Sequence, residues 1–100
     1  MALLLVLHDL GPEPPEEAEN RFFSAVFEVA PDHWRVTPGA TLVGTEVSPR
    51  YLVDHLRRAA ERAGIAPRLL LATPVPEEEG AVAAHGLTPE GEAWLREMRG

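Results

Sequence analysis

The sequence contains no cysteine. A disulfide framework, a thiolate zinc site and a cysteine nucleophile are therefore all excluded. Lysine and glutamine are also absent, and Asn20 is the only asparagine, so all nine basic residues are arginine. Together with ten prolines, this composition is similar to the loss of thermolabile residues and the rigid loops of thermophilic proteins, although a GC-rich genome would give the same bias.

Long apolar runs are absent as well, and none approaches the length of a membrane span. The apolar stretch at residues 2–7 follows no basic region and is too short for a signal peptide, so we expect a cytoplasmic protein with no membrane partner. The formal net charge is -7, which disfavours long-range attraction to a phosphate backbone. Nucleic acid is therefore not an expected partner.

The common catalytic motifs are missing too. The sequence has no Gly-rich phosphate loop, no nucleophile elbow at either serine and no histidine pair at helical metal spacing. The four histidines stand 22 to 30 residues apart, so only the fold could bring them to a shared metal. We therefore expect no catalytic residue and no cofactor, and the sequence favours a protein that is not an enzyme.

The length and the apolar patterning of the chain are those of one small domain. Residues 2–7 and 68–75 are apolar runs typical of strands that are buried on both faces. Residues 33–37 and 40–47 flank Pro38-Gly39 and predict a β-hairpin. If Thr37 opposes Ala40, then Trp34, Val36, Val43 and Val47 share the core face of this hairpin.

Three helices are expected between and after these strands. The first begins near Pro15 and ends before Pro31, with an apolar face through Phe22 and Val26. The second begins at the cap Ser48-Pro49 and ends at Gly64. A third follows Thr88-Pro89, and residues 75–86 are expected to form a loop.

The order strand, helix, strand, strand, helix, strand predicts an α+β fold, the ferredoxin-like plait (βαββαβ) with an extra C-terminal helix. Residues 1–74 would form the ferredoxin-like domain, and residues 75–100 a loop and a C-terminal helix that packs on the domain or on a partner subunit. In this fold two helices cover one face of the sheet, whereas residues 2–7 and 69–72 are apolar on both faces. The second face must be covered by the last helix or by another copy, and we favour a homo-oligomer, most simply a dimer.

A few residues are candidates for binding a ligand or a partner. Trp34 and Trp94 could form a flat ligand platform, although core or interface packing is the usual role of tryptophan. His8 stands where the first apolar strand meets solvent. The second helix carries Arg50, Arg57, Arg58 and Arg62, but Asp54 and Glu61 are spaced to neutralise them.

Asp9 follows His8 at the carboxyl end of the first strand. LVLHDL, Trp34–Val36, ATLVGTEVSP and RLLLA together resemble the small CRISPR spacer-acquisition subunits and their SinR-like relatives, over about residues 2–74. The resemblance implies that Asp9 is a metal-associated aspartate, contributed by each subunit of a dimer, for phosphodiester cleavage with a divalent ion. His8 stands where that family has an aromatic residue, and the tail at 75–100 has no counterpart in it.

Two kinds of function follow. The first is a self-associating, non-catalytic module that binds a protein partner or a small ligand, and a small-molecule sensor would give the same sequence pattern. The alternative is a metal-dependent nuclease or nucleic-acid-processing protein that uses Asp9 across a dimer interface.

Overall fold

The computed structural model describes residues 1–78 and 80–99, so Glu79 and Gly100 of the predicted tail lie outside the described residues. One antiparallel sheet has the strand order β2-β3-β1-β4 and is formed by β1 (Ala2–Asp9), β2 (Asp32–Thr37), β3 (Ala40–Thr45) and β4 (Leu69–Pro74). The helices are α1 (Glu16–Val29), α2 (Pro49–Arg62) and α3 (Pro89–Arg99). The predicted α+β class is confirmed, and the arrangement is compatible with a ferredoxin-like fold.

Side-chain caps begin two of the helices where the sequence predicts them. The Ser48 hydroxyl accepts a hydrogen bond from the backbone N–H of Tyr51 at 3.1 Å, and the Thr88 hydroxyl accepts one from Gly91 at the same distance. Each cap satisfies a backbone donor that has no partner inside its helix. Gly64 follows α2 with a φ of +84°, which is the left-handed conformation expected after a helix end.

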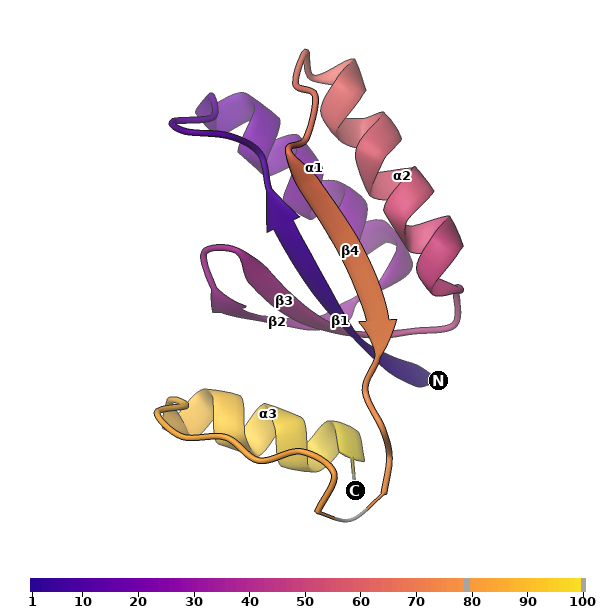
Figure 1. Ribbon diagram of the computed structural model, residues 1–100, viewed down its shortest axis with the longest axis vertical. Helices are drawn as coiled ribbons and strands as arrows, with labels where there is room; N and C mark the ends of the chain where they lie inside the picture. Colours follow the sequence, from indigo (N-terminus) through magenta and orange to yellow (C-terminus); the bar gives the residue numbers. More distant parts are fainter. Residues whose placement is uncertain (79, 100) are drawn as a thin grey trace.

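The core lies between one face of the sheet and the pair α1 and α2, which lie side by side in Figure 1. Leu4 and Val6 reach this core from β1, and Val43 reaches it from β3. The helices contribute the side chains that their apolar spacing predicts, namely Phe22, Ala25, Val26, Leu52, Leu56 and Ala60. Each of these helices therefore has its predicted apolar face on the sheet.

The β2–β3 hairpin differs from the predicted register. Thr37 does oppose Ala40, but a β-bulge between Arg35 and Thr37 shifts the pairing, so that Trp34 opposes Leu42. An extra residue in one strand moves all following side chains to the other face. Trp34 consequently shares a face with Leu42 and not with Val43, and the predicted core face of this hairpin is wrong at Trp34.

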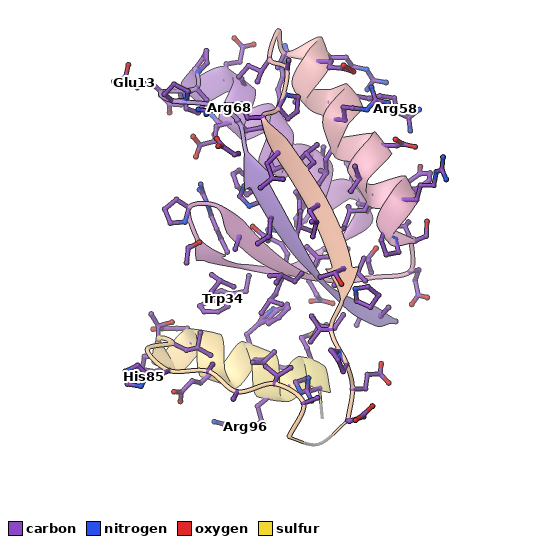
Figure 2. All side chains as sticks on the ribbon, viewed as in Figure 1. Glu13, Trp34, Arg58, Arg68, His85 and Arg96 are labelled. Carbon is purple, nitrogen blue, oxygen red and sulfur yellow. The ribbon has the colours of Figure 1, made fainter. Side chains whose placement is uncertain are left out.

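Helix α3 lies on the other side of the sheet from α1 and α2, next to the β2–β3 hairpin (Figure 1). Trp34 projects from β2 toward this helix (Figure 2). Its ring lies so close to Gly91 that a Cβ there would overlap it, and a Cβ at Gly44 would overlap the methyl group of Met98. Two glycines thus allow α3 to approach the hairpin closely.

The half of this second face formed by β1 and β4 has less cover. Leu69 and Leu71 of β4 are 45% and 43% exposed, and Leu5 and Leu7 of β1 are partly exposed. By the pairing register, Leu7 lies opposite Leu71 on the same face. We call Leu5, Leu7, Leu69 and Leu71 the open leucine patch.

We predict that Gly91→Leu displaces α3 from the hairpin, because the new side chain would occupy the space of the Trp34 ring. Overpacking of this kind typically costs about 1–3 kcal/mol. In a Trp94→Phe background, Trp34 fluorescence should shift to longer wavelength as the ring becomes hydrated. Ala93→Leu is the matched control, because Ala93 is exposed on the same helix, and an equal shift in both variants would contradict the proposed contact.

Candidate functional site

Two of the four residues predicted to bind a metal, ligand or partner lie together at the carboxyl end of β1. His8 and Asp9 both line a cavity of about 400 Å³, which is also bounded by the loop after β1, by α1 and by the β2–β3 turn. The other two, Trp34 and Trp94, are not among its lining residues. The sequence prediction thus locates one part of a site and not a complete one.

His8 is a buried histidine in an aromatic environment. Only 6% of its surface is exposed, and its ring lies 5.3 Å from that of Phe22 and 5.5 Å from that of Phe23, between centroids. Its Nε2 atom is hydrogen-bonded to the Thr41 hydroxyl at 2.9 Å. This pairing satisfies both polar groups inside the core, where an unpaired one would be costly.

The surroundings of His8 favour its neutral form. Burial lowers its pKa below the ordinary value of 6.5, and the positive charge of Arg35 lowers it further, while the carboxylate of Glu19 acts in the opposite direction. His8 is therefore a neutral imidazole at neutral pH.

The other ring nitrogen of His8, Nδ1, is not hydrogen-bonded to any of the described residues. No fully buried polar side-chain atom in residues 1–78 and 80–99 lacks a partner, so Nδ1 is within reach of solvent. Because His8 lines the cavity, we infer that Nδ1 opens to it. A neutral imidazole can present either a donor or an acceptor there.

Asp9 is exposed and shapes the turn that follows β1. Its Oδ1 atom accepts a hydrogen bond from the backbone N–H of Gly11 at 2.8 Å, and Gly11 has a φ of +96° that favours glycine. Its backbone carbonyl accepts a hydrogen bond from Arg68 at 2.8 Å. Within the described chain, no three histidine, aspartate or glutamate side chains come together in a group that could hold a metal ion.

Arg35 supplies the positive charge of the cavity. Its guanidinium group lies 4.4 Å from the centroid of the Phe23 ring and donates hydrogen bonds to Glu19 at 3.2 Å and to the Pro38 carbonyl at 2.9 Å. Stacking and two hydrogen bonds fix the orientation of this planar group.

The two tryptophans of the predicted platform lie outside the cavity that His8 and Asp9 line. Trp34 packs on Gly91, and Trp94 is a partly buried residue of α3 itself. Of the arginines of α2, Arg57 pairs with Glu61 at 2.9 Å as the spacing predicts, and also with Asp54 at 3.7 Å. The predicted partner of Asp54, Arg58, donates to the backbone carbonyl of Asp54 at 3.3 Å instead. Arg58 projects from α2 into solvent (Figure 2).

Comparison with known proteins gives no family for this chain. No protein-family model matches it, and neither do any curated proteins or solved structures. A proposal about its function must therefore come from its own residues. In the part of the chain that the structure describes, no helix is long and apolar enough to cross a membrane.

Sequence reasoning missed Arg35, Phe23 and Thr41 as members of this site. The bulge in β2 brings Arg35 to the helix-covered side of the sheet, where it meets Phe23 and Glu19 of α1. Nothing in the local pattern around Arg35 indicates a bulge. The third strand contains two threonines, Thr41 and Thr45, and a polar residue in this largely apolar strand was a signal for a buried hydrogen-bonding partner.

We predict that His8 makes the protein less stable as the pH falls. The pKa of His8 is lower in the folded state than its unfolded value of 6.5, so the unfolded state binds the proton more tightly. The stabilising contribution is complete above pH 6.5 and is lost as the pH falls through 6.5 toward the folded pKa.

The measurement is the free energy of unfolding in urea between about pH 7.5 and about pH 5. The comparison protein is the double variant His8→Phe, Thr41→Val, which removes both partners of the buried hydrogen bond together. The wild type should lose more stability over this range than the double variant. Parallel curves for the two proteins would show that His8 does not titrate as described.

Proposed function

We propose that this protein is a self-associating, non-catalytic module with a ferredoxin-like plait, in which a second copy of the chain covers the open leucine patch. The observation that carries the proposal is the exposure of Leu69 and Leu71 beside the partly exposed Leu5 and Leu7. Leaving a large aliphatic side chain in water instead of burying it costs roughly 1.5–3 kcal/mol. Contiguous apolar surface of this kind is typical of an interaction site.

The apolar character of the open leucine patch favours a second copy as the occupant. The chain carries a formal net charge of -7, so two copies repel each other over most of their surfaces. The four leucines of the open leucine patch are uncharged, so apolar contact there can oppose this repulsion, and Asp9 lies at the edge of the patch, opposite Leu69. An exposed apolar sheet face is also suited to a twofold interface, in which each chain presents the same surface to the other.

The element order and the strand order β2-β3-β1-β4 support the ferredoxin-like part of this proposal. In such a plait the two crossover helices cover one face and leave the other available. The role of the module would be to hold a protein partner or a small ligand, in a cytoplasmic setting that suits a chain without cysteine.

We predict that Leu71→Glu weakens self-association at least about tenfold, or about 1.4 kcal/mol, because a buried unpaired carboxylate would be placed in each half of the interface. Sedimentation velocity over a range of concentrations measures the dissociation constant. Phe27→Glu is the matched control, because Phe27 is 60% exposed on α1, away from the patch. A wild-type protein that stays at the 10.9 kDa mass of one chain at all concentrations would contradict the proposal.

The alternative is a nucleic-acid-processing protein that uses Asp9. It is supported by the exposure of Asp9 at the carboxyl end of β1, on the same face as Leu7 by strand alternation. A dimer formed through the open leucine patch could therefore bring two Asp9 side chains toward each other. A single chain does not fit a divalent ion, because Asp9 belongs to no group of three ligating side chains among the described residues.

The test of this alternative is incubation with single- and double-stranded RNA and DNA, with magnesium or manganese, beside an Asp9→Asn variant. Our first proposal predicts no cleavage by either protein. Cleavage that is lost in Asp9→Asn would support the alternative, while cleavage that persists unchanged would remove Asp9 from it.

A further inference from the structure

The cavity at the end of β1 differs from the open leucine patch in both position and chemistry. It encloses about 400 Å³, which is within the range of small-ligand pockets. Its apolar wall includes Leu10, Pro14 and Phe23, and its polar lining includes His8, Asp9, Glu19 and Arg35. Sites for small organic molecules typically combine an apolar wall with a few fixed polar groups.

The polar lining carries charges of both signs. Arg35 contributes one positive charge, and Asp9 and Glu19 contribute two negative charges, while His8 is neutral for the reasons given above. With one positive and two negative charges, the lining disfavours a simple anion. A small molecule with both an ammonium and a carboxylate group can be attracted to all three at once.

Both kinds of charged group retain hydrogen-bonding capacity. A guanidinium group has five N–H donors, and the hydrogen bonds to Glu19 and Pro38 use one donor from each terminal nitrogen of Arg35. Asp9 uses Oδ1 to accept the Gly11 N–H, and its carboxylate has further acceptor capacity. The buried ring of His8, whose Nε2 is held by Thr41, also lines the cavity.

From this arrangement we propose that the cavity binds a zwitterionic amino acid with an apolar side chain. The carboxylate of the ligand is recognised by Arg35, its ammonium group by Asp9 and Glu19, and its side chain by the wall around Phe23. The guanidinium group of Arg35 is already held in place by its hydrogen bonds and by stacking on Phe23. It can therefore form paired, planar hydrogen bonds with a carboxylate at little cost in side-chain entropy. The proposal does not depend on self-association, which a separate sedimentation experiment measures.

The test uses leucine and two analogues that each lack one charge. Leucinamide keeps the ammonium group and lacks the carboxylate, while N-acetyl-leucine keeps the carboxylate and lacks the ammonium. Titration calorimetry on the intact protein should show leucine binding at least about tenfold more tightly than either analogue. Amide resonances of Gly11 and Gly39, which line the cavity, should shift in the nitrogen–proton spectrum when leucine binds.

Two variants test which side chain of the protein binds each charged group of the ligand. Arg35→Gln should weaken leucine binding and leave leucinamide binding unchanged, and Asp9→Asn should weaken leucine binding and leave N-acetyl-leucine binding unchanged. Arg57→Gln and Asp54→Asn are matched controls on α2, because neither residue lines this cavity, and they should bind leucine as the wild type does. Circular dichroism confirms that each variant is folded before binding is compared.

Three results would overturn the proposal. The first is no binding of leucine by calorimetry up to about 10 mM, well above useful affinity for a small ligand. The second is binding of either analogue as tightly as leucine, which would mean that only one charge is recognised. The third is that leucine shifts resonances on α3 and its preceding loop and none at Gly11 or Gly39. Leucine would then bind outside this cavity.

Discussion

Strand β1 occupies an interior position in the sheet and is apolar on both faces, and the rest of the structure depends on how those faces are covered. On one face, Leu4 and Val6 are buried beneath α1 and α2 together with Phe22 and Leu52. The other face carries Leu3, Leu5 and Leu7, and no helix between the strands reaches it. Because burying each such side chain contributes roughly 1.5–3 kcal/mol, the second face is a large part of the energy balance of a small domain.

The chain covers this second face only in part. Helix α3 approaches the β2–β3 hairpin closely because Gly91 and Gly44 have no side chains, which allows Trp34 and Met98 to occupy the interface. Leu3 is 7% exposed on this side of the molecule, whereas Leu71 on the outer strand β4 is 43% exposed. A second copy of the chain and α3 thus have complementary roles in our account, each covering one half of the same face.

The fold could be predicted from the sequence to a large extent because its strongest signals are local. The Ser48-Pro49 cap and the apolar spacing of Leu52 and Leu56 require no information about distant residues, and both are present as predicted. The orientation of Trp34 could not be predicted, since a β-bulge depends on how two strands twist against each other. The site was predicted only where it coincides with a strand end, at His8 and Asp9. Arg35 comes to the same cavity through that bulge, so the same feature of the hairpin explains both errors.

The central claim is that the open leucine patch is buried by a second copy of the chain. The most direct measurement is methyl NMR of leucine-labelled protein with a soluble paramagnetic agent, at high concentration and after dilution. Our account predicts that the methyl groups of Leu69 and Leu71 are protected from the agent at high concentration and become accessible on dilution. Methyl groups that are equally accessible at every concentration, as expected for the exposed side chains of a single chain, would contradict it.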